Sequence, residues 1–147
     1  MKIYYAAPLF TDAEREWNLR NASHLRAAGL TVLLPQEFCA VFDQAKAAAG
    51  TPPFDLIFAA CRDHLDQADA VLAIIDGADP DSGTCWEAGY AYAKGKPIVS
   101  LRTDWRPGED GGANAMLTRS SVAVVRNLSS AISLLQERTN TTKETRS

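Results

Sequence analysis

The feature that most constrains the fold is a series of short apolar runs alternating with segments of helical periodicity. The run from Ala70 to Ile75 contains no polar residue, which is typical of a strand buried on both faces of a parallel sheet. Parallel strands need crossover connections, usually helices, so the pattern predicts an α/β chain. We expect a flavodoxin-like, doubly wound domain with a five-stranded parallel sheet. Its predicted strands are residues 2–6, 30–34, 70–75, 97–101 and 122–125.

The first predicted helix has recognisable signals at both ends. Thr11 and Glu14 have the spacing of a capping box, and Gly29 is suited to the residue that follows a helix. The segment after the last helix has no apolar side chain to bury. We therefore expect a domain over residues 1–137 and a disordered C-terminal tail over 138–147. The other predicted helices span residues 37–49, 54–67, 84–94 and 128–137.

Charge and hydropathy exclude several classes of partner. Fifteen basic and eighteen acidic residues give a net charge of −3, and no polybasic run could neutralise a series of phosphates. No apolar stretch approaches the ~20 residues of a membrane span, and the N-terminal residues lack the pattern of a signal peptide. We expect a cytoplasmic protein that binds neither nucleic acid nor membranes.

The residue inventory also argues against a metal or a bound cofactor. Cys39, Cys61 and Cys85 form no C-x-x-C pair, and only two histidines are present, so we expect reduced, buried thiols and no metal site. The glycine-rich motifs that cradle a dinucleotide or a nucleotide phosphate are missing, as is the G-x-S-x-G motif of serine hydrolases. The chemistry must come from carboxylates, amides and hydroxyls.

Carboxylates are concentrated around the end of the third predicted strand. Asp76, Asp79, Asp81 and Glu87 follow it, and Asp63 lies on the helix before it. Paired carboxylates are the groups that cleave a glycosidic bond. Two plainer interpretations stay open, since the aspartates suit a solvated turn and Glu87 has the capping-box spacing from Thr84. The apolar neighbours of Glu87 favour a functional role.

The segment D-S-G-T-C-W-E-A-G-Y-A at 81–91 is the most specific of several motifs between Lys2 and Met116. Together these motifs resemble the nucleoside 2-deoxyribosyltransferase family and occur in the family's order. The family is flavodoxin-like, so the resemblance implies the fold already predicted. It also implies an enzyme without a cofactor that exchanges the nucleobase of a 2′-deoxyribonucleoside for a free nucleobase, as in purine salvage. The other matching segments are I-Y-Y-A-A-P-L-F at 3–10, L-P-Q-E at 34–37, D-A-V-L-A at 69–73 and N-A-M at 114–116.

The resemblance implies three catalytic residues. Glu87 matches the nucleophile that attacks C1′ and forms a covalent deoxyribosyl-enzyme. Tyr4 matches the tyrosine that orients this nucleophile, although an aromatic residue filling the core is an equally simple interpretation. Asp63 matches the aspartate that exchanges a proton with the departing base, although it could equally be a solvated helix residue.

The resemblance also implies substrate-binding residues. Asp81 and Asn114 match the pair that binds the 5′-hydroxyl of the sugar, with Asn114 supplied by a neighbouring subunit. Gln36 and Phe38 are expected to contact the base, and Met116 to line the sugar pocket. The expected assembly is a homodimer or a trimer of dimers.

Three rival functions remain at this stage. A 2′-deoxynucleoside 5′-monophosphate N-hydrolase would transfer the sugar to water, but such enzymes have serines where this chain has Asp81 and Asn114. A carboxylate at Asp81 would repel the phosphate by several kcal/mol at an effective dielectric constant of about 20. A cytokinin-type phosphoribohydrolase is disfavoured because Pro80-Asp81-Ser82 replaces its P-G-G. A non-enzymatic, flavodoxin-like signalling or ligand-binding module predicts binding without turnover.

Overall fold

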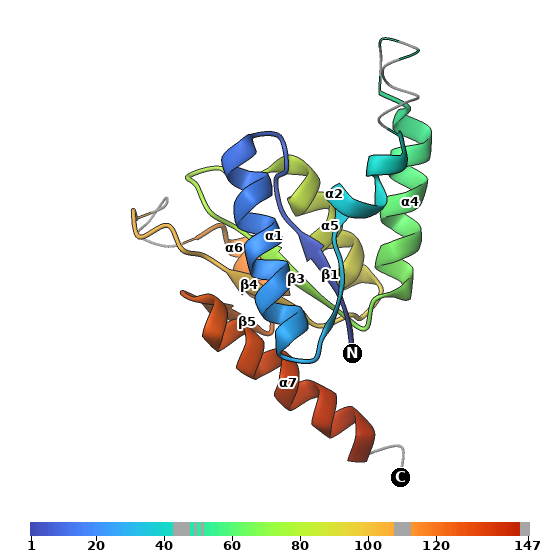
Figure 1. The fold of residues 1–147 in the computed structure, drawn as a ribbon. Helices are drawn as coiled ribbons and strands as arrows, with labels where there is room; N and C mark the ends of the chain where they lie inside the picture. The colour runs from blue at the N-terminus through green and yellow to red at the C-terminus, as the bar shows by residue number, and fades with distance from the viewer. Residues whose placement is uncertain (43–47, 49, 51, 108–112, 145–147) are drawn as a thin grey trace.

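The structure, a computed structural model, describes residues 1–42, 48, 50, 52–107 and 113–144. Its centre is a five-stranded parallel sheet in the order β2-β1-β3-β4-β5 (Figure 1). This is the flavodoxin-like order, in which the direction of winding reverses between β1 and β3. Ligands of such sheets bind beyond the carboxyl ends of the strands at that reversal. The predicted fold class is confirmed.

The strands are β1 (Lys2–Ala6), β2 (Thr31–Leu33), β3 (Ala70–Ile74), β4 (Ile98–Leu101) and β5 (Ala123–Val125). The helices are α1 (Asp12–Ala27), α2 (Pro35–Phe38), α4 (Phe54–Gln67), α5 (Ser82–Ala93), α6 (Ala115–Ser120) and α7 (Leu128–Glu144), with a short 3₁₀ turn, η1 (Ala40–Phe42).

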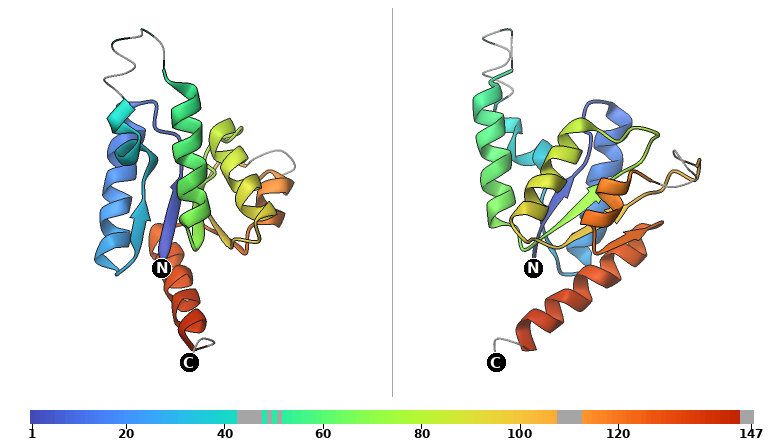
Figure 2. Two further views of the ribbon diagram at one scale, coloured as in Figure 1. Left: turned by 90° about the vertical axis from the view of Figure 1, so that its right-hand side faces the viewer. Right: turned by 180° about the vertical axis from the view of Figure 1, so that it is seen from behind.

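Helices cover both faces of the sheet and divide the core into two layers. Ile3 and Tyr5 of β1 pack with residues of α1 and α7, whereas Tyr4 and Ala6 pack with residues of α4, α5 and α6. This division follows from the alternation of side chains along a strand. Figure 2 shows α4, α5 and α6 on the face opposite α1 and α7. The two tyrosines of β1 are therefore buried on opposite faces.

Local signals in the sequence place the first helix correctly. The side chain of Thr11 accepts a hydrogen bond from the backbone of Glu14, and the Glu14 carboxylate accepts one from the backbone of Thr11. Gly29 follows the helix with φ of 86°, a left-handed conformation that glycine adopts without strain. Both ends match the prediction.

The structure corrects three helices. The helix predicted over 37–49 starts at Pro35 and ends at Phe38, and most of its remaining length lies outside the described residues. Helix α6 was not predicted, because its only start signal is Asn114, whose side chain accepts from the backbone N–H of Met116 and Leu117. Helix α7 continues to Glu144 and so replaces the predicted disorder over 138–144. No glycine or proline interrupts that stretch.

The described helices include none with the length and apolar character that crossing a bilayer requires. The cytoplasmic location stays a prediction.

Candidate active site

A tyrosine and a glutamate meet at the point where the winding of the sheet reverses. The Tyr4 hydroxyl on β1 donates a hydrogen bond of 2.5 Å to Oε1 of Glu87 on α5. Tyr4 is fully buried, so its hydroxyl has a fixed position from which to orient the carboxylate. The structure excludes the capping role for Glu87, because α5 begins at Ser82 and Glu87 lies in its second turn.

Burial dominates the electrostatics of this pair. It raises the pKa of Glu87 to about 8, against the opposing effect of the hydrogen bond from Tyr4. The negative charges of Cys61 and Asp81 raise the pKa of Glu87 further when those groups are ionised. Burial, followed by the charge of Glu87, raises the pKa of Tyr4 far above its usual range. Tyr4 therefore acts as a permanent hydrogen-bond donor.

Cys61 is the third titratable group at this point. It lies on α4 near Tyr4 and near Cys39, the residue that follows α2, and both side chains are close enough to change its pKa. The polar interaction with Cys39 is the main cause that lowers the pKa of the Cys61 thiol to about 7. Burial opposes this shift, and the interaction with Tyr4 adds to it. Four side chains from four segments thus form one connected group: Cys39, Cys61, Tyr4 and Glu87.

Asp81 caps the helix that carries Glu87. Its Oδ2 accepts hydrogen bonds from the backbone N–H of Thr84 at 2.8 Å and from the Thr84 hydroxyl at 3.1 Å. Asp81 is also close enough to Glu87 to raise the pKa of that carboxyl group. The cap and the carboxylate at the candidate site therefore belong to one element.

A comparison with known families identifies this arrangement. The sequence model described as "Nucleoside 2-deoxyribosyltransferase" matches residues 3–128. The chain belongs to the nucleoside 2-deoxyribosyltransferase family. Members of this family are enzymes that act on the N-glycosidic bond.

Individual relatives of this family member agree with the assignment. The chain is similar to the 2-deoxyribosyltransferase of Bacillus psychrosaccharolyticus, with a TM-score of 0.71, 26% identity and 90% of each chain covered. It is also similar to a 2-deoxyribosyltransferase of Leishmania mexicana, with a TM-score of 0.70, 25% identity, and 92% of this chain and 97% of that one covered. The uncharacterized protein UU063 of Ureaplasma parvum is 35% identical over 117 residues, covering 72% of each chain.

The structure does not bring Asp63 together with Glu87 in this family member. Asp63 is exposed on α4 and forms an ion pair of 2.9 Å with Arg62. At about 100° per residue, it lies roughly 200° around the helix from Cys61 and therefore faces away from Tyr4. This position corresponds to the solvated helix residue considered above.

The two residues expected to contact the nucleobase, Gln36 and Phe38, follow β2. Gln36 accepts a hydrogen bond from Asn18 and donates one to the carbonyl of Arg15, so it ties α2 to α1. Phe38 packs beside the Tyr4 ring at 6.2 Å and stacks on His64, with ring centroids 3.8 Å apart. Phe38 is therefore adjacent to the candidate site, whereas both ends of the Gln36 amide make intramolecular hydrogen bonds.

Asn114 and Met116 lie on a different side of α5. They line a groove with Cys85, Gly89 and Tyr92, which share one face of that helix. Glu87 is roughly 140–160° around α5 from those three residues. Both Asn114 and Met116 are exposed. Within one chain, the helix α5 separates them from Glu87.

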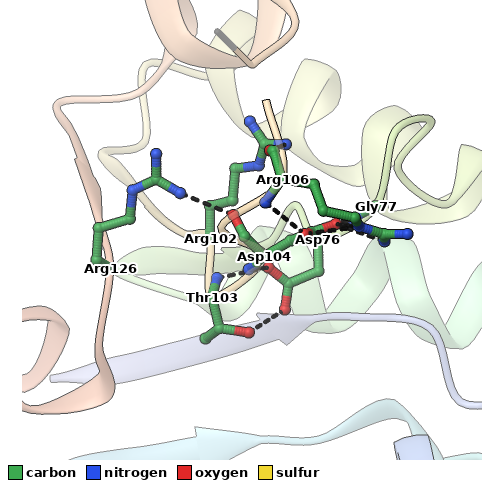
Figure 3. A network of polar contacts seen from close by, with 7 residues as sticks. All are labelled: Asp76, Gly77, Arg102, Thr103, Asp104, Arg106 and Arg126. Atoms are coloured by element: carbon green, nitrogen blue, oxygen red, sulfur yellow. Dashed lines mark hydrogen bonds and ion pairs between the residues drawn. The ribbon is translucent and has the colours of Figure 1, made fainter. Parts of the chain in front are cut away.

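Asp76 has a structural role that its position among the carboxylates did not indicate. Its side chain accepts hydrogen bonds from the backbone and hydroxyl of Thr103 and from the backbone N–H of Asp104 (Figure 3). Asp104 in turn accepts from the backbone of Gly77 and from Arg106. This network joins the segments that follow β3 and β4. Asp79, the remaining carboxylate of that group, is exposed.

Sequence reasoning missed Cys61 and Cys39 as members of the site. A signal for Cys61 existed, because it precedes buried Leu65 by four residues and so shares the inward face of α4. No comparable signal marks Cys39, whose contact with Cys61 joins segments distant in the sequence.

Proposed function

We propose that this protein is a nucleoside 2-deoxyribosyltransferase that exchanges nucleobases through a covalent deoxyribosyl-Glu87 intermediate. The observation that carries the proposal is the Tyr4–Glu87 hydrogen bond at the reversal of the sheet. A half-buried carboxylate held by a permanent donor has the fixed direction that a nucleophile needs. The family, which acts on the same bond, supports the substrate class.

The reaction proceeds by two displacements. Oε of Glu87 attacks C1′ of the deoxyribose while the bond to the base nitrogen breaks, and a second base then attacks C1′ from the vacated side. Each displacement inverts C1′, so the product retains the configuration of the substrate. Tyr4 holds the carboxylate in line during both steps.

Asp81 favours a free nucleoside over a 5′-monophosphate. Its carboxylate caps α5 close to Glu87, so a phosphate on the 5′-oxygen would meet a like charge. The Asp81 carboxylate instead suits a 5′-hydroxyl, which can donate a hydrogen bond. Preference for the monophosphate dIMP over deoxyinosine would favour the N-hydrolase alternative.

The arrangement also supports a site shared between subunits. Asn114 and Met116 are exposed beside a groove that faces away from their own Glu87. A second copy on that face would place Asn114 and Met116 beside the partner's substrate, as the family resemblance implies. We propose a homodimer or a trimer of dimers, with Asn114 binding the 5′-hydroxyl in the neighbouring site.

The experiment that tests the function follows base exchange directly. Deoxyinosine and free adenine are incubated with the protein, and deoxyadenosine and hypoxanthine are measured by chromatography. The expected result is equal formation of both products, with inosine in place of deoxyinosine reacting much more slowly. Hypoxanthine without deoxyadenosine would identify a hydrolase, and binding without either product would identify a non-enzymatic module.

A further inference from the structure

A departing nucleobase needs a proton, and the structure indicates where that proton is held. A purine leaves poorly as an anion, so a general acid must protonate it as the bond to C1′ breaks. Asp63, which the family resemblance assigns to this step, faces away from Glu87 and pairs with Arg62. The proton source must therefore be found among the groups that do adjoin the nucleophile.

The titratable groups facing Glu87 come from three elements. They are Tyr4 on β1, Cys61 on α4 and Asp81 at the start of α5. Tyr4 holds its proton too strongly to release it. Asp81 uses its carboxylate as the helix cap. His64 also lies on α4, but its ring stacks on Phe38 and its Nδ1 makes a hydrogen bond with the carbonyl of Ala60. We therefore do not assign the proton transfer to His64.

Resting on the proposed function, we propose that Cys61 is the general acid and base of base exchange in this chain, the role that the resemblance gave to Asp63. Its thiol lies near the Tyr4 hydroxyl that bonds the nucleophile, on the face of α4 that carries buried Leu65, and it is partly exposed, so a bound base can reach it. Cys39 also lies near the sulfur and stabilises the thiolate left after proton transfer.

The proposed step balances in both directions. As Oε of Glu87 bonds to C1′, the electron pair of the C1′–N bond moves to the base nitrogen. The Cys61 thiol transfers its proton to the base, which leaves neutral, and the sulfur becomes a thiolate. When the acceptor base attacks C1′ and displaces Glu87, its N–H proton returns to the Cys61 sulfur. No other reactant is consumed.

The chemistry favours one proton shared between Cys61 and Glu87. Two anions near the Tyr4 hydroxyl repel each other, so ionisation of Cys61 or Glu87 disfavours ionisation of the other. The pKa of the thiol, about 7, suits an acid that must also act as a base near neutral pH. Near neutral pH the shared proton rests mainly on Glu87, which has the higher pKa, so the productive state is the other arrangement, with a Glu87 carboxylate and a Cys61 thiol.

The decisive experiment compares a substrate whose leaving base must be protonated with a substrate whose leaving base need not be. In 7-methyl-2′-deoxyguanosine the base is already cationic and leaves neutral without being protonated. Cys61→Ala is expected to slow cleavage of deoxyinosine by roughly 10²–10⁴-fold and to slow cleavage of 7-methyl-2′-deoxyguanosine by less than about tenfold. Cys61→Ser, which keeps the size and polarity but is too weak an acid, is expected to show the same selectivity.

Two matched variants serve as controls. Asp63→Asn and Ser133→Ala, the latter on the exposed face of α7, should each retain wild-type rates on both substrates. If Cys61→Ala and Cys61→Ser lost the same factor of cleavage rate on both substrates, the thiol would have only a structural role and the proposal would be wrong. A loss confined to deoxyinosine in Asp63→Asn would restore the aspartate as the acid. Failure of the wild type on both substrates would instead contradict the proposed function itself.

Discussion

At the scale of single residues, Glu87 carries most of the expected rate. Glu87→Gln preserves the shape and the acceptor for Tyr4 but removes the nucleophile, so we expect base exchange to fall at least ~10³-fold, or about 4 kcal/mol of transition-state stabilisation. Glu16→Gln, on the exposed surface of α1, is the matched control. A folded Glu87→Gln protein with a tenth of wild-type activity would refute the assignment. A slow 2′-fluoro arabinoside should label Glu87 covalently, as detected by mass spectrometry.

The same residue should lower stability as the pH rises. The folded protein retains the Glu87 proton up to a pKa of about 8, whereas the unfolded chain loses it near the reference pKa of 4.5. Stability from this group is therefore present below pH ~4.5 and is lost as pH rises toward 8. Glu87→Gln does not titrate, so at pH 8.5 its Tm should exceed that of the wild type by on the order of 10 °C. Thermal unfolding at several pH values should show this difference shrinking toward pH 5, and a constant difference would contradict the pKa shift.

At the scale of elements, α5 depends on a cap, Asp81, that under the proposed function also faces the substrate. Replacing Asp81 with Ala removes the acceptor for the Thr84 N–H and should cost about 0.5–2 kcal/mol of unfolding free energy. Asp81→Ser keeps an oxygen at the cap and should cost little. Asp81→Ser also removes the negative charge, so we expect its preference for deoxyinosine over dIMP to narrow. Chemical denaturation measures the capping role, and kcat/KM for deoxyinosine and dIMP measures the electrostatic role. If Asp81→Ser kept the wild-type preference for deoxyinosine over dIMP, the electrostatic role would be disproved.

The elements also show what sequence alone could provide. Strand positions were predicted to within about one residue, because continuous apolar runs and flanking turn residues are local signals. The start of α5 was placed two residues late, because Thr84 has the spacing of a capping residue while Asp81 makes the cap. The Tyr4–Glu87 pair was available only through the family resemblance, and the position of Asp63 on the outer face of α4 is the second of two interpretations that the sequence left open. Contacts between distant segments, such as Cys39 with Cys61, leave no local pattern.

At the scale of the whole molecule, a shared site predicts complementation between two defective chains. Glu87→Ala lacks the nucleophile, and Asn114→Ala lacks the proposed contact to the partner's substrate. Random mixing makes half of the dimers mixed, and each mixed dimer has one intact site of two. Refolding the two chains together should restore activity toward about a quarter of wild type. If labelled subunits exchange and activity is not restored, Asn114 does not act across the interface.

The alternation of the two tyrosines along β1 has a consequence for folding fidelity. If β1 slipped by one residue toward its N-terminus, Tyr5 would take the place of Tyr4 and could still offer a hydroxyl to Glu87. The same slip would put Ala6 in the place of Tyr5, beside Asn21, whose amide now bonds the Tyr5 hydroxyl. The slipped state would leave a tyrosine-sized void and an unpaired amide in the layer under α1. The layer that takes no part in the chemistry therefore rejects a misalignment that the catalytic layer alone would tolerate.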